Sequence, residues 1–266
     1  MKLFYRHYGE GPPVIILHGI LGISDNWVTI GRRLAQNFEV FIPDQRNHGQ
    51  SPHSDTFNYY ALVDDLFEFI EDHQLIKPIL IGHSMGGKVA MNYTLEHPHR
   101  IDKLIVVDIS VRNYQARRQH LDILDAMLSV DFDQHLTREG IEAIIYKKIK
   151  SPSIAGFIMK NLYRIGKNRL AWRLNIQSIY QNIENVFEGV DLSYTSDLPA
   201  LFIKGGDSDY ILEEDYPLIL KKFPNAIFKT IENASHWIHA DAPDELCKSF
   251  SDFLKKECAF SANSSK

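Results

Sequence analysis

Cysteine is scarce in this sequence, and long apolar runs are missing. The only two cysteines, Cys247 and Cys258, lie near one end, which is neither a disulfide framework nor a metal-site spacing. No run approaches the roughly 18 apolar residues of a membrane helix. The first residues, MKLFYRHYGEGPP, lack the apolar segment of a secretion signal. These absences predict a cytoplasmic protein with no membrane partner and no bound metal.

An excess of positive charge is also missing. The 29 lysines and arginines are outnumbered by 34 aspartates and glutamates, which gives a formal net charge of -5. A chain without a basic field is a poor binder of nucleic acid, so no nucleic-acid partner is expected. The 44% of hydrophobic residues is ordinary for a globular protein. The 266 residues are therefore enough for one large core. Chains of this length can also carry an inserted subdomain.

Short apolar runs alternate with segments of helical length. Between the second and third runs, residues 57–75 place Leu62, Leu66, Phe69 and Ile70 on one helical face. Strands that alternate with helices predict an α/β fold with a mostly parallel sheet covered on both faces. The predicted strands are residues 14–17, 39–42, 78–82, 103–108, 200–204 and 226–231.

Residues 110–195 interrupt this alternation, because they contain no comparable β run and are typical of several amphipathic helices. We predict a core domain of residues 1–109 and 196–258, a helical cap subdomain of residues 110–195 and a flexible tail of residues 259–266. The cap would lie above the strand ends where ligands bind in open α/β sheets. The alternative is a helical layer that only thickens the core.

Gly82-His83-Ser84-Met85-Gly86 directly follows an apolar strand and directly precedes a helical segment. This context is that of a nucleophile elbow, in which a strained turn exposes a serine hydroxyl at a helix N-terminus. Glycine is needed on either side because strand and helix approach too closely for a Cβ. The sequence predicts that Ser84 is a nucleophile.

Backbone N–H groups beside this serine would stabilise an oxyanion. The Met85 N–H at the helix N-terminus is one candidate. The loop after the first predicted strand, His18-Gly19-Ile20-Leu21, supplies the Ile20 N–H as the second. His18 precedes the serine in the chain, so it is expected to brace the loop and not to act as the base.

The base is predicted to be His236, in the loop NASHW between the last strand and the C-terminal helix. His239 follows three residues later, but no third ligand is patterned with this pair. A structural histidine is therefore expected at position 239.

Four segments, HGILGISDNW, PDQRNHGQSPHS, IGHSMGGKVAM and NASHWIHADAPDEL, together resemble the α/β-hydrolase superfamily, and specifically its bacterial YbfF-like esterase branch. The resemblance spans nearly the whole chain and is weakest across residues 110–195. It implies hydrolysis of esters or thioesters through a Ser-His-Asp triad and an acyl-enzyme, with no cofactor.

The acid of the triad is the ambiguous member. Alignment of the apolar runs puts Ser208 where most members of the superfamily have an aspartate, and Asp207 and Asp209 flank it. Asp108 ends another predicted strand at the same edge of the sheet, and the resembled branch uses an aspartate there. We predict Asp108 as the acid, with Asp209 and then Asp207 as alternatives. The structural alternative for Asp108 is a helix N-cap.

The substrate is a small-molecule ester or acyl-CoA. Leu21, Trp237 and apolar residues of the cap are candidates for an acyl pocket, and Arg117 and Arg118 could pair with phosphates of CoA. Two other functions remain open: a lyase similar to the menaquinone-pathway synthase, which uses the same triad with cap arginines, and a catalytically silent binding module. A monomer or homodimer is expected. The cap residues of the candidate pocket are Ile123, Leu124 and Met127.

Overall fold

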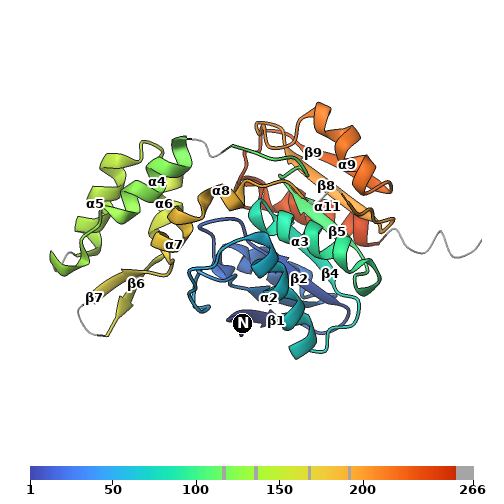
Figure 1. Cartoon of the computed structure of the whole chain (residues 1–266), viewed down its shortest axis with the longest axis horizontal. Helices are drawn as coiled ribbons and strands as arrows, with labels where there is room; N and C mark the ends of the chain where they lie inside the picture. Colours follow the sequence, from blue (N-terminus) through green and yellow to red (C-terminus); the bar gives the residue numbers. More distant parts are fainter. Residues whose placement is uncertain (116–117, 135–136, 167–168, 191–192, 256–266) are drawn as a thin grey trace, which may run out of the picture.

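A seven-stranded sheet forms the centre of the protein (Figure 1). The computed structural model describes residues 1–115, 118–134, 137–166, 169–190 and 193–255. The strand order is β1-β3-β2-β4-β5-β8-β9, and only β1 runs antiparallel to its neighbour. The strands are β1 (Tyr5–Tyr8), β2 (Pro13–Leu17), β3 (Glu39–Pro43), β4 (Ile79–His83), β5 (Leu104–Val107), β8 (Ala200–Gly205) and β9 (Ala226–Ile231).

The strands are apolar at consecutive positions because both faces of the sheet are buried. In β2, Ile15 and Leu17 pack into one hydrophobic cluster, and Val14 and Ile16 pack into the other. The first cluster includes α2 (Tyr59–Asp72), α3 (Met85–Glu96) and α9 (Tyr216–Lys222), and the second includes α1 (Val28–Leu34) and α11 (Pro243–Leu254). The predicted parallel sheet covered on both faces is confirmed. β1 is an additional edge strand that we did not predict.

Residues between β5 and β8 form a lobe beside the sheet (Figure 1). The lobe contains helices and also β structure, which the sequence pattern did not indicate. β6 (Leu162–Ile165) and β7 (Arg169–Trp172) pair antiparallel as a small separate sheet. Both strands have four residues and are partly exposed, so they leave no apolar run in the sequence. The helices are α4 (Arg118–Leu128), α5 (Arg138–Lys148), α6 (Pro152–Met159), α7 (Ile176–Gln181) and α8 (Ile183–Val186).

The two chain segments that enter and leave this lobe lie side by side. Tyr114 N donates to the Phe187 carbonyl at 2.7 Å, so the segments are joined through the backbone. The buried Lys88 of α3 holds both, because its Nζ donates to the carbonyls of Arg112 at 2.5 Å and Glu188 at 2.7 Å. The lobe is thus tied to the helix that follows Ser84.

Candidate active site

Ser84 sits at the sharp turn between β4 and α3, with φ 52° and ψ −121°. Only a tightly packed surrounding keeps a serine in this sparsely populated conformation. The packing also explains the flanking glycines. A Cβ on Gly82 would collide with the Gly86 carbonyl, and a Cβ on Gly86 would collide with the Leu17 carbonyl. The turn therefore projects Ser84 from the carboxyl edge of the sheet, at the N-terminus of a helix.

A chain of hydrogen bonds connects Ser84 with the two other predicted members of the triad. His236 Nε2 lies 3.0 Å from Ser84 Oγ, and its Nδ1 lies 2.7 Å from Asp108 Oδ2. His236 comes from the loop between β9 and α10 (Ile238–Asp241), while Asp108 directly follows β5. Three loops at one edge of the sheet bring the three residues together. Since a carboxylate accepts from Nδ1, the Nε2 lone pair is directed at the serine hydroxyl.

The Asp108 carboxylate is completely buried and receives two further hydrogen bonds. Gly205 N donates to Oδ1 at 3.0 Å, and the hydroxyl of Ser208 donates to Oδ2. Ser208, which occupies the position of the usual acid in the aligned strands, therefore contacts the aspartate that we predicted from the alternative position. The side chains of Asp207 and Asp209 are exposed. The helix that follows Asp108, α4, starts only at Arg118, so Asp108 is not its N-cap.

Ile20 and Met85, the predicted oxyanion donors, both line the cavity that contains Ser84. Met85 is the first residue of α3, a position whose N–H has no acceptor within the helix. The loop of Ile20 is held on both sides. Gln45 N donates to His18 Nε2 at 3.0 Å, and Leu21 N donates to His48 Nε2 at 3.2 Å. His18 thus braces the loop.

Burial keeps the histidines around the site neutral. It lowers the pKa of His18 to about 4 and that of His48 to about 3. Burial also lowers the pKa of His83 far below the usual value, and its Nε2 bonds to the His236 carbonyl at 2.8 Å. The pKa of His239 falls to about 4 for the same reason, and its ring stacks on Trp27. These neighbours therefore place no positive charge beside His236.

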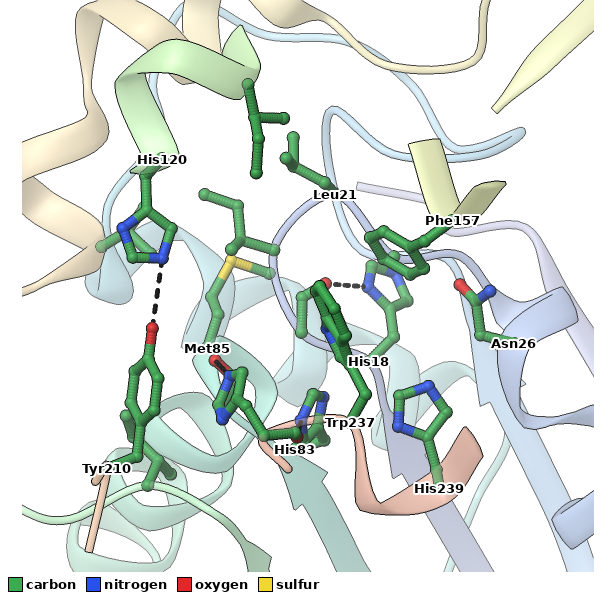
Figure 2. Close-up of a pocket in the computed structure, with 18 of the residues that line it drawn as sticks. His18, Leu21, Asn26, His83, Met85, His120, Phe157, Tyr210, Trp237 and His239 are labelled. Atoms are coloured by element: carbon green, nitrogen blue, oxygen red, sulfur yellow. Dashed lines mark hydrogen bonds between the residues drawn. The ribbon is translucent and has the colours of Figure 1, made fainter. Parts of the chain in front are cut away.

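The cavity above Ser84 is small and mostly apolar, with a volume of about 70 Å³ (Figure 2). Of the residues proposed for an acyl pocket, Leu21, Trp237 and Ile123 line this cavity, whereas Leu124 and Met127 are buried in the hydrophobic core and do not line it. The cap closes the cavity with further residues that we did not predict: His120, Ile154, Phe157, Ile158, Val186 and Phe187.

Arg118, one of the two arginines predicted to bind CoA phosphates, is not among the residues that line this cavity. Arg118 is 93% exposed and lies 3.8 Å from Asp122, one helical turn further along α4. Arg117 lies outside the described residues, as does the predicted tail of residues 259–266.

Within the described part of the chain, no group of three or more His, Cys, Asp or Glu side chains is arranged to hold a metal ion. None of the described helices is both long and apolar enough to cross a membrane.

The sequence did not indicate two further residues, Tyr210 beside His236 and Asn161 beside the Leu21 loop. The Tyr210 ring stacks on the imidazole with 3.8 Å between centroids and 17° between planes. Its hydroxyl lies 3.1 Å from His120 Nε2 on α4 (Figure 2). Asn161 of the cap donates to the Leu21 carbonyl at 3.0 Å. Such contacts join segments about 90 or more residues apart, and nothing local in the sequence indicates them.

Comparison with known proteins gives the family of this chain. Residues 12–142 match the family described as the alpha/beta hydrolase fold. An sn-1-specific diacylglycerol lipase of Danio rerio is 36% identical over 253 residues, covering 93% of this chain and 80% of that protein. The chain belongs to the α/β-hydrolase family.

Bacterial relatives of this α/β-hydrolase include Esterase YbfF of Escherichia coli, 34% identical over 91% of this chain and 92% of that protein. Among solved structures, a marine microorganism esterase superposes with a TM-score of 0.93 and 41% identity, covering 96% of this chain and all of that one. The predicted fold and the resemblance to the YbfF-like branch are therefore confirmed.

Proposed function

We propose that this α/β-hydrolase is a serine esterase that cleaves carboxylic esters with a short acyl group through an acyl-enzyme. The observation that carries the proposal is the hydrogen-bonded chain from Asp108 through His236 to Ser84, which opens into an apolar cavity. The relatives named esterase or lipase support hydrolysis of ester bonds.

In the proposed mechanism, His236 Nε2 removes the Ser84 proton as Oγ attacks the ester carbonyl. Negative charge then develops on the carbonyl oxygen, where the N–H groups of Ile20 and Met85 stabilise it. His236 returns the proton to the leaving oxygen, which breaks the ester bond and leaves the acyl group on Ser84. Water repeats the sequence and releases the acid. Asp108 holds the imidazole tautomer throughout.

The size of the cavity limits the acyl group. One water requires about 10–15 Å³ by the same measure, so about 70 Å³ holds roughly five non-hydrogen atoms. Acyl groups from acetyl to butanoyl fit this space. A longer chain needs movement of the cap residues Ile154, Phe157 and Ile158, which close the cavity.

Hydrolysis of p-nitrophenyl acetate, butyrate and octanoate by the full chain tests the proposal. Wild type should cleave the two shorter esters. Its kcat/KM for octanoate should be lower by roughly tenfold or more, because methylene groups that do not fit an enclosed pocket cost at least this much. Ser84→Ala should lose roughly 10⁴-fold or more in kcat. Ser249→Ala on α11, a serine remote from the cavity, serves as the matched control.

Two outcomes would overturn this function. Turnover that persists in Ser84→Ala would exclude Ser84 as the nucleophile, and absence of ester turnover in the folded wild type would favour the lyase or binding-module alternatives. The lyase alternative depends on cap arginines, and Arg118 is exposed to solvent.

A further inference from the structure

Asn161, a residue of the cap, contacts the loop that carries the Ile20 N–H. It lies between α6 and β6 and is only 1% exposed. Its Nδ2 donates to the Leu21 carbonyl at 3.0 Å. Asn161 is not among the residues that line the cavity above Ser84. An effect of its side chain on the reaction would therefore act through Leu21.

Leu21 has a backbone conformation that leucine rarely adopts. Residues 19–22 form a β-turn, closed by a hydrogen bond from Gly22 N to the Gly19 carbonyl at 3.0 Å. Of the two central residues, Ile20 and Leu21, only Leu21 has a positive φ, at 60°. This is the pattern of a type II turn, which normally has glycine at that position because a side chain is strained there. Surrounding contacts must hold a leucine in this conformation.

Two hydrogen bonds fix the backbone of Leu21, and they come from different parts of the molecule. On the core side, Leu21 N donates to His48 Nε2 at 3.2 Å. On the cap side, the Leu21 carbonyl accepts from Asn161. Both partners are buried, so water does not weaken either bond. The strained turn therefore depends on the core and the cap together.

The part of the cap that contains Asn161 also closes the cavity. Ile154, Phe157 and Ile158 of α6 line the cavity, and Phe157 lies across it from the side chains at Ser84 (Figure 2). Asn161 N donates to the Ile158 carbonyl at 2.9 Å, which fixes Asn161 to the end of α6. Movement of α6 away from the core would thus take Asn161 away from the Leu21 carbonyl.

We propose that Asn161 is a positioning residue that couples closure of the cap over the acyl group to the oxyanion hole of Ile20 and Met85. This inference rests on the proposed esterase function and adds a cause for its preference for short acyl groups. With a short acyl group, α6 stays in place and Asn161 holds the turn that aims the Ile20 N–H at the oxyanion. A longer chain displaces α6, which loosens this turn and slows the chemical step. Acyl length therefore affects kcat as well as KM.

The variant Asn161→Leu tests the positioning role, because it removes the donor and keeps most of the side-chain volume. Its kcat for p-nitrophenyl acetate should fall roughly tenfold with KM nearly unchanged, a smaller loss than the roughly 10²–10³-fold expected for a direct oxyanion donor. Asn161→Ser, whose side chain is too short to reach the Leu21 carbonyl, should lose kcat to a similar extent. Thermal unfolding shows which variants are folded.

A transition-state analogue reports on the oxyanion hole itself. With 1,1,1-trifluoropentan-2-one, Ser84 Oγ bonds to the carbonyl carbon, the Oγ proton passes to His236, and the carbonyl π electrons become an oxyanion in the hole. The Ki of this ketone should rise in Asn161→Leu by the factor by which kcat/KM for p-nitrophenyl butyrate falls. A cap that is merely loosened would change KM without this parallel.

Relief of the strain at Leu21 should reduce the need for Asn161. Glycine adopts positive φ freely, so in a Leu21→Gly background Asn161→Leu should lower kcat by roughly threefold or less. The loss caused by Asn161→Leu should also be smaller with p-nitrophenyl octanoate than with the acetate, because the longer chain already displaces α6.

Asn182 of the cap provides the matched control. Its Nδ2 donates to the Asp55 carbonyl of the core at 3.1 Å, and neither residue lines the cavity. Asn182→Leu removes a cap-to-core bond of the same kind and should keep the wild-type kcat and the wild-type Ki for the ketone.

A folded Asn161→Leu variant with wild-type kcat, or with a loss confined to KM, would overturn the proposal. An equal fall of kcat in Asn182→Leu would also overturn it, since general weakening of the cap would then be the cause. Equal losses with octanoate and acetate would overturn the coupling to cap closure. If wild type cleaves no ester, or if cleavage survives Ser84→Ala, the esterase function itself fails, whereas each of the preceding outcomes leaves Ser84-dependent hydrolysis intact.

Discussion

At the scale of single residues, the choice of acid is the sharpest test of the site. Asp108 is buried and bonded to His236, so Asp108→Asn should leave the imidazole in the wrong tautomer and lower kcat by roughly 10³–10⁴-fold. Asp209→Asn should hydrolyse p-nitrophenyl acetate at nearly the wild-type rate, because its carboxylate is exposed. Steady-state kinetics of both variants measure this. The reverse ranking would transfer the acid role to Asp209.

Ser208 is expected to support the acid through its hydroxyl. Ser208→Ala removes a donor to the buried Asp108 carboxylate, and hydrogen bonds to charged groups contribute about 1.5–3 kcal/mol. We expect kcat to fall roughly tenfold or more with little change in KM, and Ser208→Thr to restore most of the activity. A rise in KM with kcat unchanged would argue against this role. So would a Ser208→Thr variant that fails to restore activity.

Tyr210 is expected to position the imidazole through its ring. Tyr210→Phe retains the surface that stacks on His236 and should keep kcat close to that of wild type. Tyr210→Leu should lower kcat by roughly fivefold, as expected for loss of an aromatic contact of about 1 kcal/mol. A comparison of kcat and KM separates positioning from substrate binding. Equal kcat for both variants and wild type would show that the stacking is incidental.

At the scale of elements, Lys88 links α3 to both segments that lead into the cap. Burial lowers the pKa of Lys88 to about 7, so the folded chain releases a proton that the unfolded chain keeps up to about pH 10.5. The unfolded state binds more protons in this window, and the contribution of Lys88 to stability therefore rises with pH between these values.

The Lys88→Met variant makes this contribution measurable. The unfolding free energy of wild type minus that of Lys88→Met should increase by up to about 3 kcal/mol from about pH 7 to about pH 9.5. Urea denaturation at a series of pH values measures both proteins, and subtraction cancels all other titrating groups. A difference that stays constant with pH would mean that Lys88 keeps its ordinary pKa in the fold.

Elements were predictable from the sequence where one local pattern determines them. The elbow at Ser84 combines a buried strand, two glycines without room for a Cβ and a helix, all within adjacent residues. β6 and β7 were missed because each is short and half-exposed. Tyr210 and Asn161 were missed because their roles depend on contacts between the core and the cap, which no local spacing encodes.

At the scale of the whole molecule, residues 44–51 join the core, the oxyanion loop and the cap. His48 accepts from Leu21 N, while the Asn47 carbonyl accepts from Asn175 N of the cap at 2.9 Å. Arg46 forms a buried ion pair with Asp65 of α2 at 2.5 Å. The segment DQRNHGQS, which supported the family resemblance, thus acts as a structural junction.

His48 in this junction and His18, which accepts from Gln45 N, should make the fold sensitive to acid. Burial lowers the pKa of His18 to about 4 and that of His48 to about 3, below the unfolded value near 6.5. The unfolded chain binds these protons first, so the stabilisation is complete above about pH 6.5 and is lost as pH falls toward these lower values.

The midpoint of thermal unfolding should therefore drop steeply as pH falls across this window. His48→Gln, whose amide oxygen can still accept from Leu21 N, should flatten the drop. An equally steep drop in this variant would place the acid sensitivity in other groups.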